Sequence, residues 1–241
     1  MTKDKEQIIQ AIIDAEWPMF TSINGSAQKS PCQEDRMAFN GMRRGQFAAW
    51  STEALEAYQA DVQAAQTADR NIVLEKYVFM MKSTSPGQYE KVSHLVNEPT
   101  GKRMELIEEI TRQLVLETEK LFSRYPYVAD TGRPIHSTED DLNHTSIETY
   151  HRGELSTYSE QTLLALQRHM KGLIANGESL AKNILEETVK YLGYETLEAA
   201  EAFAKKRCEA GIKIGYKRCP ACSCLKISIF PKSRAGENTR T

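Results

Sequence analysis

The sequence lacks an excess of charge of either sign and has no long apolar run. Its 241 residues contain 31 lysines and arginines against 33 aspartates and glutamates, which gives a formal net charge of −2. A chain so nearly balanced has no overall field that would recruit nucleic acid or an anionic membrane. No stretch approaches the ~20 apolar residues that a membrane-spanning helix needs. We therefore expect neither nucleic acid nor membrane as a partner.

Cysteine is scarce and odd in number. The chain has five cysteines, four of them from Cys208 onward, which is typical of a reducing compartment rather than of a disulfide framework. The first residues carry acids and lead into an amphipathic pattern, unlike a secretory signal. We therefore expect a cytoplasmic protein.

Familiar catalytic fingerprints are also absent from the sequence. It contains no Walker loop, no dinucleotide-binding fingerprint and no Gly-x-Ser-x-Gly elbow. No motif of this kind names a reaction, a substrate or an oligomeric state.

Apolar residues recur at helical spacing along most of the chain. In the first such stretch, residues 4–20, Ile8, Ile12 and Phe20 share one face. The same spacing predicts helices over 34–49, 52–67, 71–82, 103–124, 140–157, 160–175, 178–191 and 195–210, and a short element near 88–96. Short connections between amphipathic helices of these lengths predict an all-α bundle.

A weak internal repeat indicates how this bundle is built. The segment Arg44-Gly-Gln-Phe-Ala-Ala-Trp-Ser51 returns later in the chain as Arg152-Gly-Glu-Leu-Ser-Thr-Tyr-Ser159. Residues that this register pairs, as it pairs Arg44 with Arg152, are called counterparts. Further upstream, Met19-Phe20-Thr21 resembles Leu121-Phe122-Ser123 at an offset shorter by six. Internal repeats reveal architecture before any local motif does, so we expect two related halves with pseudo-twofold symmetry.

These halves cover about residues 4–96 and 103–210 and form one helical domain over 1–211. The extension 212–241 has a different pattern, in which apolar residues alternate with Lys, Gly and Ser. Such alternation predicts a small hairpin, and the polar end after Pro231 is typical of a disordered tail.

The cysteines of this extension form the clearest local motif. Cys219-Pro-Ala-Cys222 resembles half of a zinc ribbon, in which a turn presents two thiolates to one metal. Cys208 and Cys224 could complete a four-thiolate site. Because a second Cys-x-x-Cys is absent, free thiols remain the alternative to a structural zinc, and no other cofactor is indicated.

The repeat places one polar residue within each of two equivalent apolar stripes. The stripes consist of Phe39, Met42, Gln46 and Trp50 in the first half and Ile147, Tyr150, Glu154 and Tyr158 in the second. Their spacing of three, four and four residues sets each stripe on one helix face. A buried carboxylate without a partner costs several kcal/mol, so Glu154 needs a proton or a cation such as Arg43 or Arg133.

Two interpretations of these stripes remain open. In the structural one, Gln46 and Glu154 cross-link helices and the arginines neutralise them. In the functional one, both stripes line a shared cavity between helices, where bundles usually hold ligands. A carboxylate with a shifted pKa, flanked there by Trp50, Tyr150 and Tyr158, is a candidate general acid or base.

Several blocks in order resemble a known family. They are Glu16–Phe20, Cys32–Asp35, Met42–Gln46, Asn71, Glu75–Tyr77, Met80–Thr84 and Thr145–Ser159. Through them residues 5–203 resemble the bacterial domain-of-unknown-function 4125 family, which has no assigned reaction. The resemblance implies that Cys32, Gln33, Arg43 and Glu148 belong to a site, and His151 departs from the apolar residue expected there.

Cys32 is a candidate nucleophile with a structural alternative. It precedes a predicted helix, whose N-terminus lowers the pKa of a thiol, but Glu34 and Asp35 in the first turn oppose this effect. A structural thiol remains the alternative.

We thus predict a cytoplasmic protein that binds or transforms a small metabolite by acid/base chemistry. The candidate site consists of Glu154, Glu148 and Cys32 as catalytic residues and of Arg43, Gln46, Trp50, Gln33, Tyr150, Tyr158 and Arg133 as binding residues. The alternative is a non-enzymatic interaction module that docks a partner protein through its helical faces or its Cys-rich tail.

Overall fold

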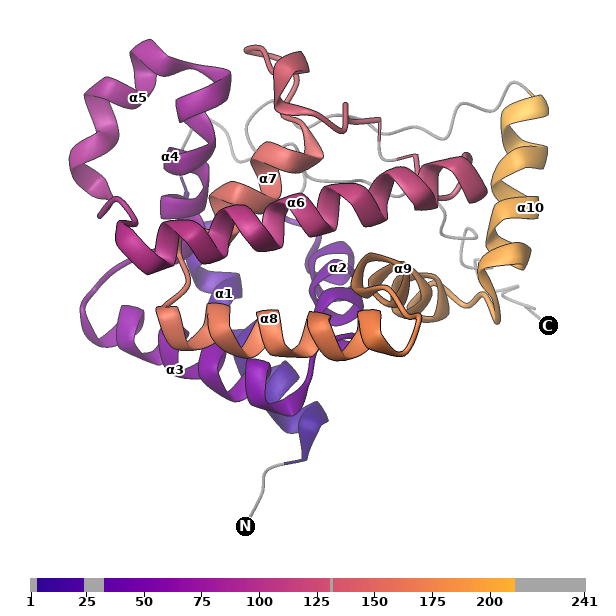
Figure 1. Ribbon diagram of the computed structural model, residues 1–241, viewed down its shortest axis with the longest axis horizontal. Helices are drawn as coiled ribbons and strands as arrows, with labels where there is room; N and C mark the ends of the chain where they lie inside the picture. The colour runs from indigo at the N-terminus through magenta and orange to yellow at the C-terminus, as the bar shows by residue number, and fades with distance from the viewer. Residues whose placement is uncertain (1–3, 24–32, 131, 211–241) are drawn as a thin grey trace, which may run out of the picture.

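The computed structural model describes residues 4–23, 33–130 and 132–210, and this part of the chain is helical without strands (Figure 1). The helices are α1 (Lys5–Thr21), α2 (Arg36–Ala48), α3 (Thr52–Thr67), α4 (Ile72–Thr84), α5 (Pro86–Val92), η2 (Ser93–Leu95), α6 (Gly101–Arg124), η3 (Ser137–Glu139), α7 (Ile147–Leu155), α8 (Glu160–Ala175), α9 (Leu180–Tyr191) and α10 (Leu197–Glu209). The predicted all-α fold is confirmed. The predicted C-terminal hairpin lies outside the described residues.

Polar caps set several of the helix starts. Ser51 accepts a hydrogen bond from the backbone N–H of Ala54 at the start of α3, and Ser159 does the same for Thr162 at the start of α8. Such a cap satisfies one of the first N–H groups, which have no partner within the helix. The two capping serines are counterparts in the repeat.

The prediction of a helix over 140–157 was wrong at its start. The helix α7 begins only at Ile147, because Ser146 caps it by accepting from the backbone N–H of Thr149. The carboxylate of Asp140 accepts from the backbone N–H of Ser146 and from the Thr149 hydroxyl, and so holds the preceding segment in an irregular conformation.

The two halves pack against each other through exchanged helices. The helix α2 packs on α9, α7 packs on α4, and α3 packs on its counterpart α8. Within the halves, α1 contacts α2, α3 and α4 as α6 contacts α7, α8 and α9. In Figure 1, α6 and α8 run across the front of the molecule, with α2 and α9 between them and α10 at one end. These pairings are those that two related halves predict, and the pseudo-twofold symmetry remains a prediction.

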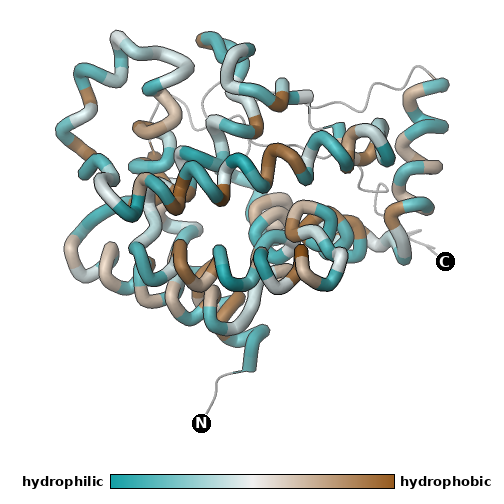
Figure 2. The backbone as a smooth tube through the Cα atoms, in the orientation of Figure 1, coloured by the Kyte–Doolittle hydropathy of each residue, from teal (hydrophilic) through white to brown (hydrophobic). Residues whose placement is uncertain are grey.

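The apolar faces of these helices meet in one large core. Its fully buried members include Ile8, Phe47, Ile107 and Leu163 from four different helices. Figure 2 shows the hydrophobic residues as stretches that alternate with hydrophilic ones along each helix. A smaller cluster around Tyr125 joins α10 to the end of α6.

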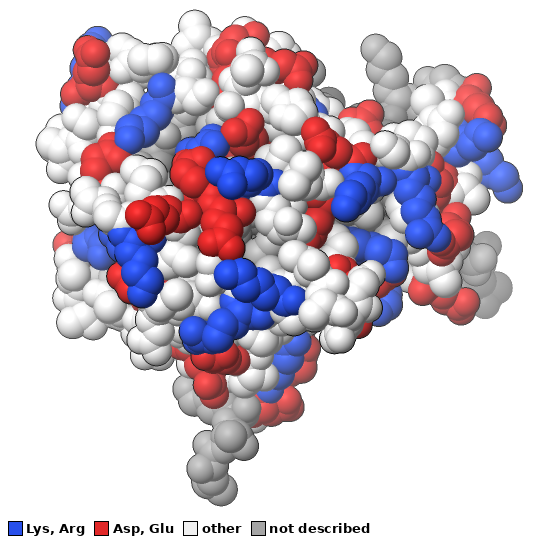
Figure 3. Space-filling model, in the orientation of Figure 1, with Lys and Arg blue, Asp and Glu red and all other residues white. Residues whose placement is uncertain are grey.

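The outer surface carries both signs of charge. Figure 3 shows Lys and Arg interspersed with Asp and Glu on the face formed by α6 and α8. Among the described residues, no helix combines the length and the apolar character that crossing a membrane requires.

Two glycines allow the exchanged helices to approach closely. A Cβ on Gly45 of α2 would lie 3.0 Å from the Cα of Thr188 on α9. A Cβ on its counterpart, Gly153 of α7, would lie 2.8 Å from Met80 Cγ and 3.0 Å from the Lys76 carbonyl oxygen on α4. The repeat therefore keeps a glycine at both helix crossings because neither has room for a side chain.

Candidate functional site

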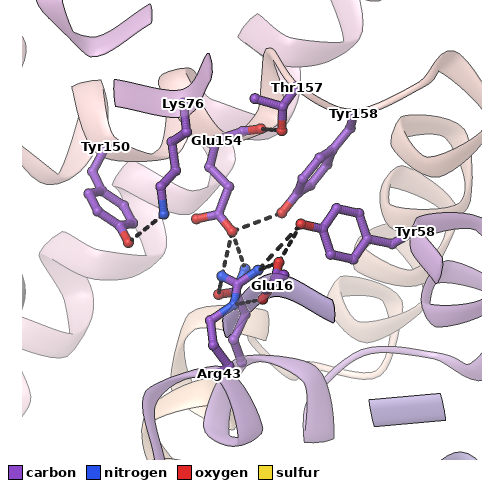
Figure 4. A network of polar contacts seen from close by, with 9 residues as sticks. Glu16, Arg43, Tyr58, Lys76, Tyr150, Glu154, Thr157 and Tyr158 are labelled. Carbon is purple, nitrogen blue, oxygen red and sulfur yellow. Dashed lines mark hydrogen bonds and ion pairs between the residues drawn. The ribbon is translucent and has the colours of Figure 1, made fainter. Parts of the chain in front are cut away.

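A buried ion cluster joins α1, α2 and α7 at the centre of the molecule (Figure 4). The guanidinium of Arg43 donates from Nε to Glu16 Oε2 over 2.7 Å, from Nη2 to Glu16 Oε1, and from Nη1 to Glu154 Oε1 over 2.6 Å. All three residues are at most 5% exposed. A guanidinium presents its N–H donors in a fixed planar arrangement, so Arg43 can bind one carboxylate of each half at the same time.

Neutral side chains complete the hydrogen bonds of this cluster. The Tyr58 hydroxyl donates to Glu16 Oε1 over 2.6 Å, and the Tyr158 hydroxyl donates to Glu154 Oε1 over 3.0 Å. Gln46 accepts from Arg43 Nη1 over 2.8 Å and donates to Glu154 Oε1 over 3.3 Å. Gln46 and Glu154, the equivalent polar residues of the two stripes, are therefore hydrogen-bonded to each other.

Lys76 of α4 supplies the second cation. Its ammonium donates to the Tyr150 hydroxyl over 3.0 Å and lies 4.7 Å from the centroid of that ring. Burial opposes its charge, but Tyr150 and Glu154 outweigh burial and raise the pKa of Lys76.

The charges of this cluster are fixed by one another. Burial alone would raise the pKa of Glu154, but Arg43 and Lys76 outweigh it and hold the pKa of this carboxyl well below its usual range. The pKa of Arg43 is raised despite burial because Glu16 and Glu154 stabilise its charge. Glu154 is hence a carboxylate at neutral pH, and two cations balance two carboxylates.

Next to the cluster lies a cavity of about 280 Å³. Its walls come from α2, α6, α7, α8 and α9 and include apolar side chains such as Leu114, Phe122, Leu166, Leu180 and Ile184. Both stripes of the repeat reach it, with Met42 and Gln46 of α2 and the following Trp50 from the first half, and Ile147, Tyr150, Glu154 and Tyr158 from the second half. The volume is near the lower end of the range for ligand pockets, about 300–1,000 Å³.

Polar groups gather where α7 lines this cavity. Arg133 lines it with its guanidinium 5.1 Å from the centroid of the Tyr150 ring, and its Nη1 donates to the Thr145 carbonyl oxygen over 3.0 Å. His151 lies beside them, and no hydrogen bond joins its ring nitrogens to the described residues. Burial lowers the pKa of His151 against the opposing effect of Glu154, and Arg133 lowers it further.

His151 is a cavity residue that was not predicted to belong to the site. It departs from the family pattern, and burial keeps its imidazole neutral at the cavity. A signal was available in the repeat, because His151 is the counterpart of Arg43, the central cation of the first half.

A second, smaller void lies beside the ion cluster and is lined mostly by residues of the first half. It measures about 20 Å³, room for about one water molecule, and is lined by residues of the ion cluster. Twelve of its thirteen lining residues are paired by the repeat with a residue that lines the large cavity. For Glu16 and Phe20 the pairing is that of the upstream segment, in which Met19 matches Leu121. The remaining one is Thr157, whose counterpart Ala49 does not line the cavity.

Four replacements explain why the void beside the ion cluster is small and the cavity is large. In the first half the space is occupied by Glu16, Arg43, Tyr58 and Lys76, and the corresponding residues of the second half are Thr118, His151, Leu166 and Ile184. Smaller or apolar side chains thus replace an ionic network. The cavity occupies the space that the charged side chains fill in the first half.

The structure brings most of the predicted site residues together. Gln46, Trp50, Tyr150, Tyr158, Arg133 and Glu154 line the cavity, and Arg43 lies behind Glu154 in the ion cluster. Glu148 does not line it, since its carboxylate accepts from the backbone N–H of Ser137 and from Arg152. These bonds hold the pKa of Glu148 below its usual range although burial opposes them.

The remaining predicted residues lie elsewhere. Gln33 is buried and donates to the carbonyl oxygens of Phe20 and Ile23 at the end of α1. Cys32, Cys219, Cys222 and Cys224 lie outside the described residues. Cys208 is exposed on α10, and the described part of the chain holds no group of three metal-ligating side chains. The zinc site remains a prediction.

Comparison with known proteins gives one match. Neither the curated proteins nor the solved structures contain a similar chain. A family model described as "Protein of unknown function (DUF4125)" matches residues 6–202, which cover most of the chain. The blocks that suggested this resemblance include Arg43, Gln46 and Glu154 of the buried cluster. The chain therefore belongs to this family of proteins of unknown function.

Proposed function

We propose that the protein binds a small, largely apolar metabolite in the cavity between its two halves. One observation carries this proposal: a space of about 280 Å³ is lined by both apolar stripes and has Arg133, Tyr150 and His151 together in its wall. Ligand sites in proteins are usually apolar pockets with a few convergent polar groups of this kind.

Acid/base chemistry on such a ligand would use His151 rather than Glu154. The lowered pKa of Glu154 makes it a weak base, and its Oε1 already accepts from Arg43, Gln46 and Tyr158. His151 is neutral at physiological pH because burial lowers its pKa, and its ring nitrogens are free of hydrogen bonds to the described residues. A neutral imidazole can accept a proton from a bound molecule.

Filling the cavity tests the proposal. We expect native mass spectrometry of the full chain, incubated with a small-molecule extract, to reveal a retained compound that denaturation releases. Ala181→Phe places a ring in the cavity wall and should abolish retention. Ala175→Phe, on the exposed end of α8, is the matched control and should retain the compound. Equal retention by both variants, or none by the unmodified chain, would contradict the proposal.

The alternative of an interaction module has less support. It requires a continuous apolar surface, whereas the exposed large apolar side chains of the described residues are distributed over several elements, among them Met37 on α2, Leu116 on α6, Ile174 on α8 and Phe203 on α10. Singly exposed apolar residues are normal on protein surfaces.

A further inference from the structure

The charges around the cavity do not balance. Among the described residues that line it, Glu154 is the only acid and Arg133 the only lysine or arginine. Glu154 is already neutralised, since Arg43 donates to it and Lys76 lies on its other side. Arg43 also pairs with Glu16, so the cluster as a whole holds two cations and two carboxylates. The charge of Arg133 is therefore the one that remains uncompensated at the cavity.

Arg133 has unused donors. Its only hydrogen bond within the described residues runs from Nη1 to the Thr145 carbonyl oxygen, and no described carboxylate forms an ion pair with it. A guanidinium carries five N–H donors in a fixed fork, so most of them are available. Its position against the Tyr150 ring restrains the side chain, which reduces the entropy lost when a ligand binds.

We propose that the cavity binds a small apolar carboxylic acid, with the carboxylate on Arg133 and the apolar body against Leu166, Leu180 and Ile184. This inference rests on the proposed function and names its ligand class. A carboxylate accepts two parallel hydrogen bonds from a guanidinium. Its single charge matches the single uncompensated cation, whereas a phosphate monoester carries about −1.5 to −2 at neutral pH and would retain an excess charge beside Glu154.

Defined probes test this inference. The chain has two tryptophans, and Trp17 does not line the cavity, so Trp17→Phe leaves Trp50 as the sole reporter in its wall. Titration of this full-length variant with octanoate at neutral pH should change the Trp50 emission. Octanol has the same body without the charge and should bind about tenfold more weakly or worse, as expected for the loss of a charge-assisted pair. Octyl phosphate should also bind more weakly than octanoate.

Variants of the cation identify its role. Arg133→Gln should remove the preference for octanoate over octanol, and Arg133→Lys should restore part of it. Arg112→Gln replaces an exposed arginine of α6 that does not line the cavity and should leave the preference intact. The inference is overturned if octanol binds as well as octanoate, if Arg133→Gln keeps the preference, or if no acid from butanoate to decanoate binds. The cavity-filling experiment decides independently on the proposed function.

Discussion

At the scale of single residues, Arg43 connects the two halves of the chain. It binds Glu16 and Glu154, which come from the two halves of the chain, at a point where all three side chains are buried. A buried ion pair adds little stability compared with an apolar packing, but removing one member leaves an uncompensated charge. Its neighbour Arg44 is partly exposed and pairs with Glu6 at the surface.

Replacement of these adjacent arginines should therefore have very different effects. We expect Arg43→Met to lower the free energy of unfolding by about 3–5 kcal/mol, because two carboxylates remain buried without their cation. Arg44→Gln should lower it by less than about 1 kcal/mol, as for other surface pairs. Urea denaturation of both variants measures the difference. Equal losses would show that the cluster is not a major determinant of stability.

His151 should give the protein a pH dependence. Its pKa is lowered in the folded state mainly by burial, so below the unfolded-state pKa of about 6.5 the unfolded chain binds a proton that the folded chain does not. The contribution of neutral His151 to stability is therefore fully present above the unfolded-state pKa and is lost as the pH falls below it. We expect the wild type to lose more stability than His151→Gln between about pH 7.5 and about pH 5.5, an interval that brackets the unfolded-state pKa of histidine.

The comparison needs an exposed histidine as its control, and His94→Gln provides it. Glu154 does not contribute in this interval, because its effect begins only below the unfolded-state pKa of a glutamate, about 4.3. If His151→Gln and the wild type lost equal stability, the imidazole would not be buried as a neutral group.

At the scale of helices, the close crossings depend on glycine. The helix α2 contacts α9, and α7 contacts α4, at Gly45 and Gly153. Alanine is the better helix former by about 1 kcal/mol, so glycine is retained here for space and not for local conformation.

Alanine substitutions separate these two effects. Gly45→Ala places a Cβ 3.0 Å from the Cα of Thr188, and we expect it to destabilise the protein by about 1–3 kcal/mol through overpacking. Gly172→Ala, on α8 with no atom near its Cβ position, should be neutral or stabilising by up to about 1 kcal/mol. Thermal and urea unfolding measure both. Stabilisation by Gly45→Ala would mean that the crossing has room to relax.

At the scale of the whole molecule, neither half has a complete core of its own. The helices α2 and α4 find their main partners, α9 and α7, in the other half. A chain arranged in this way should fold as one cooperative unit.

Expression of the halves tests this expectation. Residues 4–96 alone should show little helical circular dichroism, because isolated helices of these lengths are marginal in water, and addition of residues 97–210 should restore it. The whole chain should show coincident urea transitions by circular dichroism and tryptophan fluorescence. A cooperative unfolding transition in the isolated first half would contradict the interlocked arrangement.

The sequence predicted the positions of individual helices better than it predicted which helices pack together. The helix over 52–67 was predicted at its observed bounds because Ser51 is a strong cap, whereas the start of α7 was missed because Asp140 and Ser146 compete with helix formation through side-chain bonds. The stripes indicated which faces turn inward. The pairing of α2 with α9, and the pairing of Arg43 with Glu16, depend on long-range packing that no periodicity encodes.

The small void and the large cavity separate the requirement for a stable fold from the requirement for an open cavity, which usually compete within one protein. Substitutions at Thr118, His151, Leu166 or Ile184 change the cavity without touching the ions that join the halves. We therefore expect substitutions at these four positions to change which compound fits the proposed site while the fold persists. Of the two copies of the repeat, the first thus supplies most of the charged groups that stabilise the fold, and the second leaves room for change.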